Sequence, residues 1–303
     1  DLIGTVLFKN ISIDPYYYYL IGISWVYALI ALPMALFRAQ EKAGFFVLTN
    51  LINAVLIMGV TIYLLVGKGL GAESALIAQL ICTSTVVIII YSFQFKYLKP
   101  SINVRYVKQS LLFSLPLLPH VASGWIIGSS SRVILEKFVN MTDLGIYSLA
   151  SQVSMVLALF YTSINNALVP RYTSLRKIGD EAKANKLIKI FTFVILIAGI
   201  CYIPVAMYSI KLVATSNYHG AMSIIPALII GQIITGFYYI PVAKLFYSTN
   251  TTAIAKSSSV AAIANISINI ITIPMIGIYG AVLSTVTSEL LRFVLIYRAS
   301  KKE

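Results

Sequence analysis

The sequence predicts an all-α polytopic membrane protein, and three observations carry that prediction. Hydrophobic residues make up 59% of the 303 positions and charged residues only 11%, whereas about a quarter of the residues in soluble domains are charged. The mean hydropathy is +0.87. Apolar windows of roughly 17 to 25 residues, the length that crosses the hydrocarbon of a bilayer, recur along the chain.

The first three spanning segments are predicted in the amino-terminal third of the chain. Four consecutive tyrosines at 16–19 open the first segment, and we interpret them as an aromatic belt at the membrane interface rather than a platform that stacks a ligand. The three predicted segments are Tyr17 to Phe37, Phe45 to Val66 and Ala75 to Phe95.

Six further segments follow, separated by connections too short to form a soluble domain. The longest connections, 96–110 and 171–189, are both basic, and the apolar spacing of the second predicts a short interfacial helix. The six segments are Leu111 to Ser131, Leu144 to Val169, Ile190 to Ser209, Ala221 to Val242, Ser257 to Ile273 and Gly280 to Tyr297.

The distribution of lysine and arginine predicts the orientation in the membrane. Eighteen of the 23 basic residues fall in the loops of one side and five in those of the other. Because basic residues near helix ends are retained in the cytoplasm, we expect a cytoplasmic carboxyl terminus. The net charge of +13 is then mainly a topology signal, so nucleic-acid binding is not needed to explain it, and attraction to anionic membrane lipids follows from it.

The start of the chain and its cysteines carry smaller predictions. The chain begins at Asp1, and 2–8 is typical of the tail of another apolar segment, so we expect an amino-terminal truncation. No signal-peptide pattern is present, so the helices themselves would direct insertion. Cys82 and Cys201 lie in different spanning segments, 119 positions apart, which indicates core packing rather than a disulfide or a metal pair. We expect no metal and no cofactor.

A weak internal repeat predicts two lobes. In each half, basic residues precede a helix with two asparagines, a glycine-rich turn follows, and a further helix ends in basic residues. The asparagine pairs are Asn50 with Asn53 and Asn265 with Asn269. Because the direction is the same in both, the lobes would be parallel six-helix repeats. We predict that 1–98 holds the last three helices of an incomplete first lobe, 99–110 a cytoplasmic linker, and 111–303 a complete six-helix lobe with a cytoplasmic tail.

Arg132 lies at the far end of a membrane-length apolar segment. An arginine at a helix centre costs roughly 2.5–3.5 kcal/mol to insert, and less toward the ends, so it usually faces protein or water rather than lipid. One interpretation is a cavity that binds an anion. The other is an arginine that snorkels to the interface, and the residues leave both open.

Pro116 and Pro119 fall inside the same predicted segment, where each would remove a backbone hydrogen bond and bend the helix. A bent helix that faces its pseudo-symmetric partner is a candidate gate or hinge. His120 follows directly and precedes a small, polar stretch that ends at Ser131 and can line water or pack closely. His120 is either a cavity residue or a hydrogen-bonded core histidine.

Glu289 and Arg292 lie three positions apart in the last segment and can pair on one helix face. Arg292 is close enough to the cytoplasmic end to snorkel, which leaves Glu289 as the deeper charge. Glu289 is therefore a candidate ion-coupling group, and a plain structural pair is the alternative.

Several motifs together resemble a known family. FSLPLLPHVASGW at 113–125, SR at 131–132 and LGIYS at 144–148 resemble the seventh and eighth helices of bacterial Wzx-type O-antigen flippases, in the multidrug, oligosaccharidyl-lipid and polysaccharide exporter superfamily. RAQEK at 38–42 and IPMIGIYGA at 273–281 resemble two further patterns, so the similarity covers nearly the whole chain. The family often has Asp-Arg where this chain has Ser131-Arg132. An acidic partner for the arginine must therefore come from elsewhere, and Glu136 is four positions on along the same helix face.

The resemblance implies a transporter of two six-helix lobes around a cavity that opens alternately to either side of the bacterial plasma membrane. Its cargo would be an undecaprenyl-diphosphate-linked oligosaccharide for O-antigen, capsule or another surface polysaccharide, and polysaccharide polymerase and chain-length proteins are candidate partners. A diphosphate needs sheltered cationic donors, for which Arg132 is the best candidate, with His120 and Ser131 beside it. Sugar hydroxyls need amide and hydroxyl groups, for which Tyr161, Asn165 and Asn166 are candidates; the two asparagines could equally cap or bridge helices.

Three other classes compete with the flippase. A membrane polymerase or acyltransferase would need a large arginine-rich outer loop or an activated nucleophile, and the chain has only two histidines, with no nearby His-Asp pair. We therefore expect no enzyme activity. A cation-coupled drug antiporter of the same superfamily should carry acidic residues in its cavity, and the spanning segments offer little beyond Glu73 and Glu289. The third class is a scaffold that transports nothing.

Overall fold

The computed structural model describes residues 15–40, 42–95, 103–115, 118–248 and 251–302. These residues form ten α-helices and no β-strand, which confirms the all-α class. Eight of the helices in the described residues are long and apolar enough to cross a membrane. The described chain divides into two compact units, between Val104 and Arg105, and each unit is described separately.

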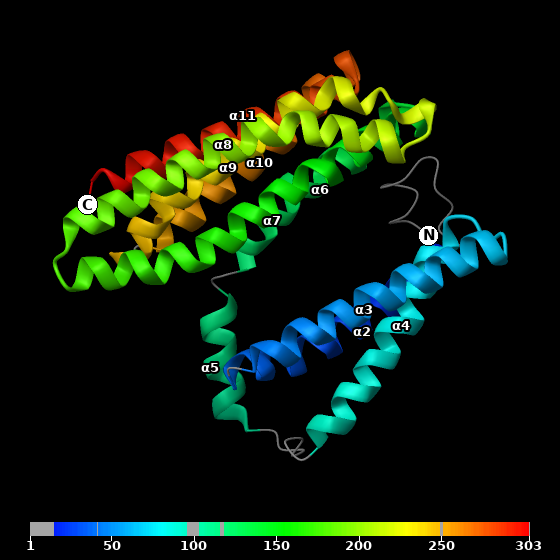
Figure 1. Cartoon of the computed structure of the whole chain (residues 1–303), viewed down its shortest axis with the longest axis horizontal. Helices are drawn as coiled ribbons and strands as arrows, with labels where there is room; N and C mark the ends of the chain where they lie inside the picture. The colour runs from blue at the N-terminus through cyan, green and yellow to red at the C-terminus, as the bar shows by residue number, and fades with distance from the viewer. Residues whose placement is uncertain (1–14, 41, 96–102, 116–117, 249–250, 303) are drawn as a thin grey trace. The chain divides into compact units, whose positions relative to one another are not determined.

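The first unit is a group of three helices (Figure 1). Both α2 and α3 pack against α4, and four side chains of α2 and α4 form a small buried cluster: Met34, Phe37, Val86 and Ile90. A single π-helical turn, Tyr63–Gly67, extends α3. The three helices are α2 (Tyr16–Ala39), α3 (Ala43–Ile62) and α4 (Glu73–Gln94).

A proline inside α2 shows how this unit satisfies its backbone without water. Pro33 has no backbone N–H, so the carbonyl of Leu29, four residues earlier, lacks its usual helical donor. The hydroxyl of Tyr91 on α4 donates to that carbonyl at 3.0 Å, and Gln94 donates to the carbonyl of Pro33 at 3.3 Å. A neighbouring helix thus replaces the lost bond, as lipid-embedded helices require.

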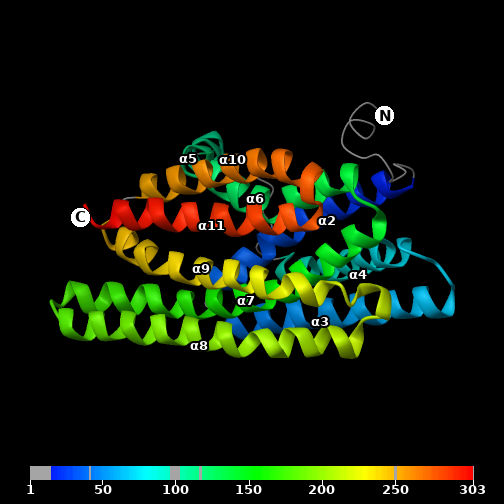
Figure 2. The same cartoon turned by 90° about the horizontal axis from the view of Figure 1, so that it is seen from above.

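The second unit contains seven helices among the described residues, and Figures 1 and 2 show α7 and α8 running antiparallel to each other from the turn that joins them. Along the unit, α6 packs on α10, α10 on α11, α11 on α9, and α9 on both α7 and α8. The main buried core lies between α7, α8 and α9. The helices are α5 (Val104–Ser114), α6 (Leu118–Phe138), α7 (Met141–Lys177), α8 (Glu181–Val213), α9 (Ala221–Tyr247), α10 (Thr251–Ile276) and α11 (Ile278–Ser300).

Two predictions about these helices are wrong. The expected span from Leu111 to Ser131 is divided, because α5 ends at Ser114 and α6 begins at Leu118. The short interfacial helix expected at 171–189 is also not observed. Instead α7 continues to Lys177 and α8 starts at Glu181, so the two long helices meet in a tight turn.

The lengths of α7 and α8 exceed the thickness of the membrane. They have 37 and 33 residues. At 1.5 Å per residue they extend about 50 to 55 Å, against roughly 30 Å of hydrocarbon. The hairpin formed by their joined ends, Arg171 to Lys189, therefore projects into the headgroup layer and beyond it.

The turn of this hairpin is built from capping and ion pairs. The Asp180 carboxylate caps α8 by accepting from the backbone N–H of Lys183 at 3.0 Å, and it pairs with the Lys183 ammonium at 2.7 Å. These bonds from the Lys183 side chain and backbone hold the pKa of Asp180 below its usual range. Arg176 pairs with Glu181 across the turn at 2.6 Å.

Candidate substrate site on helix α6

One face of α6 is packed into the second unit. Every fourth residue along it is buried, which is the spacing of one helix face. This face lies against α10, and its residues are Ser123, Ile127, Ser131 and Leu135. The packing fixes how α6 is rotated about its axis, and it therefore decides where the remaining side chains of α6 point.

A closed network of uncharged polar groups fastens this face to α10 and α11. It contains two serines from α6, two asparagines from α10 and two serines from α11: Ser130, Ser131, Asn265, Asn269, Ser284 and Ser288. All are fully buried except Ser130, which is half-buried. Hydroxyls and amides satisfy one another here, so the network binds helices together without charge.

Asn269 is the centre of that network. Its amide nitrogen donates to the Ser131 hydroxyl and to the Asn265 carbonyl oxygen, each at 3.0 Å. Its own carbonyl oxygen accepts from the Ser284 hydroxyl at 2.5 Å. Asn265 in turn accepts from Ser130 at 2.8 Å and donates to Ser288 at 3.0 Å. Ser131 was predicted from the sequence to bind substrate, but its hydroxyl is hydrogen-bonded to Asn269 and holds α6 against α10.

The adjacent face of α6 is open. Gly124, Gly128 and Arg132 follow one another at intervals of four, so they share one helix face. A Cβ added at either glycine would meet no neighbouring atom of the described residues within 4 Å. Trp125 beside them is 68% exposed. Gly124 and Gly128 thus form a strip of exposed helix backbone without side chains, and Arg132 lies at one end of it.

Among the described residues, two of the guanidinium nitrogens of Arg132 have no partner. The residue is half-buried, and its Nε and Nη2 atoms are buried without a hydrogen-bond partner. It takes part in none of the three ion pairs found among the described residues. A buried guanidinium with free donors is costly unless something else supplies acceptors. An anion that enters along the open face of α6 could do so.

Arg292 shows the opposite arrangement. Its Nη1 pairs with the Glu289 carboxylate at 3.4 Å, and its guanidinium stacks 3.8 Å from the centre of the Tyr238 ring on α9. All three residues are well buried from solvent. Glu289 is therefore engaged in a charge pair within α11, and its partner Arg292 ties α11 to α9 through Tyr238, which favours the structural interpretation over ion coupling.

Tyr161 lies at a contact between helices. It is fully buried, and its hydroxyl donates to the Ile195 carbonyl on α8 at 2.6 Å. Gly199 on α8 and Gly236 on α9 give the ring room, since a Cβ at either would come within 3.1 Å of Tyr161 atoms. The hydroxyl is occupied and enclosed, so we do not place Tyr161 in the site.

The asparagines expected to bind sugar are not brought next to Arg132. Asn165 is half-buried, with a buried carbonyl oxygen that has no hydrogen-bond partner, and Asn166 is exposed. Arg132 lies about two helical turns before the connection at Asn140, whereas Asn165 lies about seven turns after it. The two are roughly 25 Å apart along the helix axes, so no compact site contains both.

The remaining candidates lie at the start of α6. Pro119 and His120 are in the first helical turn, where a proline costs little because its N–H would be unpaired in any case. The bend expected at Pro119 depends on residues 116–117, which lie outside the described residues. Pro116 lies outside the described residues, as does the His120 side chain. The gate and the histidine remain predictions.

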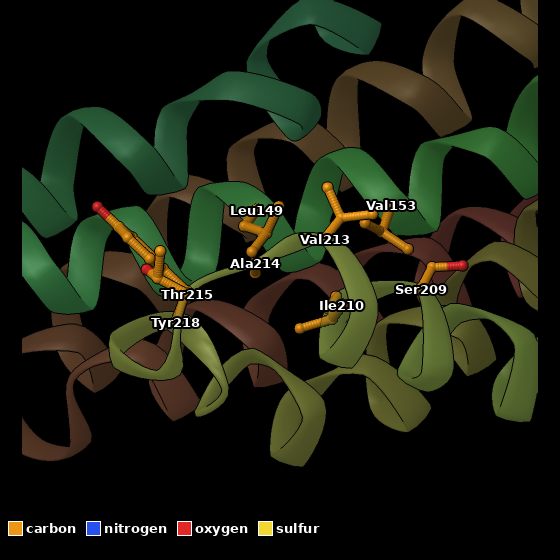
Figure 3. A pocket seen from close by; sticks show the side chains of 8 residues that line it. All are labelled: Leu149, Val153, Ser209, Ile210, Val213, Ala214, Thr215 and Tyr218. Carbon is orange, nitrogen blue, oxygen red and sulfur yellow. The ribbon is translucent and has the colours of Figure 1, made fainter.

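An apolar cavity lies elsewhere in the second unit, between α7, α8 and the short 3-10 turn Ser216–Tyr218 (Figure 3). Its volume is about 470 Å³. None of the eight residues that line it is charged. Its lining includes the apolar side chains of Leu149, Val153, Ile210 and Val213. It can accept a hydrocarbon group but not a diphosphate.

Sequence reasoning found Arg132 but missed the strip that leads to it. The signal was available, because Gly124, Gly128 and Arg132 recur at the four-residue spacing of a helix face. Likewise Asn265 and Asn269 were noticed as part of a repeat, while the same spacing places both on one face toward α6 and α11. Only the packing distinguishes an open face from a closed one.

Comparisons with known proteins agree with this architecture. A family profile described as "Polysaccharide biosynthesis protein" matches residues 23–222, well over half of the chain. AglR of Haloferax volcanii, named a probable flippase, is 25% identical over 254 residues. That alignment covers 78% of this chain and 51% of AglR, so the chain spans about half the length of this relative.

Two solved structures share the fold. The lipid II flippase MurJ, in an inward closed conformation, superposes with a TM-score of 0.74 at 18% identity, over 95% of this chain and 61% of its own. An outward-facing MATE family transporter of the MOP superfamily superposes with a TM-score of 0.65 at 13% identity, over 95% of this chain and 68% of its own. Together with the matched profile, these findings confirm the resemblance carried by the motifs: the chain belongs to the polysaccharide biosynthesis protein family and has the fold of MurJ and MATE transporters.

Proposed function

We propose that the whole protein moves undecaprenyl-diphosphate-linked oligosaccharide across the plasma membrane by alternating access, for O-antigen, capsule or other surface polysaccharide assembly. Family membership and the similarity to AglR support transport of a lipid-linked sugar rather than an enzyme activity. The observation that carries the proposal is Arg132, a half-buried cation whose Nε and Nη2 donors have no partner beside an open helix face.

The chemistry of a diphosphate fits these free donors. A guanidinium presents planar pairs of N–H groups that bind phosphate oxygens two at a time. Each hydrogen bond to a charged group contributes about 1.5–3 kcal/mol when it replaces an unsatisfied donor. Arg132 would therefore bind the diphosphate as it passes along the strip of Gly124 and Gly128, where no side chain obstructs it.

The sugar would contact a different part of the second unit. Asn165 has a buried carbonyl oxygen without a partner, which can accept a hydrogen bond from a sugar hydroxyl. The distance of roughly 25 Å between Arg132 and Asn165 suits an extended cargo rather than a small drug. In this proposal the exposed Asn166 lies beside the sugar-binding residue Asn165. Ser131 and Tyr161 do not contact the cargo and instead hold neighbouring helices together.

A cation-coupled multidrug antiporter is the second candidate, because the MATE fold is shared. Such a cavity needs an acidic group that can exchange its counter-ion. Among the described residues, Glu289 is already paired with Arg292, which in turn stacks on Tyr238. The free charge on the open face is positive, and it therefore favours an anionic cargo.

The orientation belongs to the same proposal. With the carboxyl terminus in the cytoplasm, the α7–α8 hairpin would also be cytoplasmic, and polymerase or chain-length proteins would meet the cargo on the other side. Cysteine introduced at Lys177 in a background with Cys82→Ala and Cys201→Ala should react with a membrane-impermeant reagent only from inside. Cysteine at Lys211 should react only from outside, and the reverse pattern would overturn the orientation.

Restoration of polysaccharide export in a flippase-deficient host tests the function. The whole protein with Arg132→Ala should lose export while its membrane level stays normal, and Arg132→Lys should restore it only partly, because lysine lacks the planar fork. Arg298→Ala, a matched loss of an exposed arginine at the end of α11, should export normally. Normal export by the Arg132→Ala protein would reduce Arg132 to an interface anchor.

A further inference from the structure

The hairpin of α7 and α8 carries more cations than its acids neutralise. Its two acidic residues are both occupied, Glu181 by Arg176 and Asp180 by Lys183. Four exposed cations remain that take part in no ion pair among the described residues: Arg171, Lys177, Lys186 and Lys189. This end of the hairpin therefore presents an uncompensated positive surface.

Two of these cations, Lys186 and Lys189, directly precede a stripe of exposed apolar side chains on α8. Phe193, Ile197 and Ile200 follow Ile190 at intervals of three or four, and all are exposed. Tyr208 and Leu212 extend the exposed apolar surface toward the other end of the helix. From Ile190 to Leu212 the rise is about 33 Å, close to the roughly 30 Å of bilayer hydrocarbon. This stripe therefore matches the lipid-facing surface of α8.

Its length places the lysines relative to the bilayer. Lys189 precedes Ile190 directly, so its Cα lies at the edge of the hydrocarbon, and Lys186 lies about 4.5 Å farther out. The polar headgroup layer is roughly 5 to 7 Å thick on each side. Both ammonium groups are thus at the depth of lipid phosphates. Lys183 is farther out still and already paired with Asp180.

We infer that Lys186 and Lys189 form a peripheral binding site for the phosphate headgroups of anionic glycerophospholipids. The ligand is a bilayer lipid because the lysines adjoin the lipid-facing stripe of α8. A soluble acidic partner would contact the lysines but not the apolar side chains beside them. It is separate from Arg132, which lies on a different helix, so it stands independently of the proposed cargo. The attraction of each lysine to an anionic membrane surface corresponds to roughly a fivefold change in the association constant, and salt weakens it.

Spin-labelled lipids test this inference. The chain is reconstituted in phosphatidylcholine vesicles with spin-labelled phosphatidylglycerol or phosphatidylcholine, and the motionally restricted fraction of each label gives the relative association. The wild-type chain should prefer the anionic label at low salt. Lys186→Gln with Lys189→Gln should lower that preference at least threefold, whereas Lys183→Gln should change it little because the charge is already paired.

The matched control removes the same charge elsewhere. Lys244→Gln with Lys256→Gln changes two exposed lysines on α9 and α10. This control should retain most of the preference. Equal losses in the two double variants would show a bulk-charge effect and overturn the site, as would equal association of both labels with the wild-type chain. The lysines would instead belong to the cargo site if the wild-type chain showed no preference for phosphatidylglycerol and an added polyprenyl diphosphate displaced the labelled lipids.

Discussion

The two faces of α6 differ in whether their polar groups have hydrogen-bond partners among the described residues. On one face, Ser131 and Leu135 are buried against α10, and hydroxyl and amide groups complete one another's hydrogen bonds. On the other, Gly124 and Gly128 meet no side chain, and Arg132 keeps free donors. One helix is thus fixed to its unit by uncharged groups while its charge is left for something outside the unit.

This difference has a physical logic for a transporter. A charge used in packing would have to be neutralised permanently, as Glu289 does for Arg292. An uncharged network can hold a helix at modest strength, about 0.6 kcal/mol per interhelical hydrogen bond in membranes. The packed face should therefore govern stability, and the open face should govern cargo binding.

The largest effect on stability is expected at a glycine in the second unit that packs directly against the backbone of a neighbouring helix. A Cβ at Gly280 would lie 2.6 Å from the backbone carbonyl carbon and oxygen of Thr272 on α10. Backbone cannot move aside as a side chain can, so Gly280→Ala should cost at least about 3 kcal/mol, at the upper end for overpacked sites. Thermal unfolding of the purified chain in detergent should show a large drop. An unchanged midpoint would mean that α10 and α11 are not so closely packed.

An intermediate effect is expected at the centre of the polar network. Asn269→Leu keeps the number of heavy atoms, but it leaves the hydroxyl of Ser131 without its partner and removes one of the two donors to the carbonyl oxygen of Asn265, which keeps Ser130. Leaving buried polar groups unsatisfied costs about 1–3 kcal/mol. The unfolding midpoint should fall by several degrees, at roughly 2–4 °C per kcal/mol for a unit of this size. Asn166→Leu changes an exposed asparagine and is the control, so its unfolding midpoint should change little. Equal shifts of the midpoint in the two variants would show that the polar network does not stabilise the unit.

The smallest effect on stability is expected on the open face. Gly128→Ala adds a methyl group that meets nothing, and alanine favours a helix over glycine by up to about 1 kcal/mol. The midpoint should stay constant or rise slightly. The bulkier Gly128→Leu should leave the midpoint similar while reducing polysaccharide export by the whole protein, because it obstructs the strip. Destabilisation by either change would show that this face is packed.

The sequence predicts much of the fold because hydropathy reports directly on the lipid-facing part of each helix. The segments in α2, α4 and α9 agree closely with the helices observed. The ends of α7 and α8 were missed, since their projecting turns at Arg171 to Lys189 are basic and resemble a surface loop by composition. The end of α5 at Ser114 was missed because it lies within an apolar run.

The site was less accessible to prediction. Arg132 could be identified because a charge in an apolar segment is costly wherever it points. The roles of Ser131 and Tyr161 depend on residues more than 30 positions away, such as Asn269 and Ile195, and only the packing of helices brings these together. Polar residue type alone did not distinguish a group that binds cargo from one that binds a neighbouring helix.

Direct binding of a diphosphate lipid to the whole protein tests the central claim. A short-chain polyprenyl diphosphate, titrated into the purified protein by calorimetry, should bind at least about tenfold more weakly to Arg132→Ala, which corresponds to a loss of about 1.4 kcal/mol. Arg132→Lys should fall between the two, and Arg298→Ala should match the wild type. Equal affinity of the wild-type and Arg132→Ala proteins would contradict the account, because the free guanidinium on the open face of α6 would then bind no diphosphate.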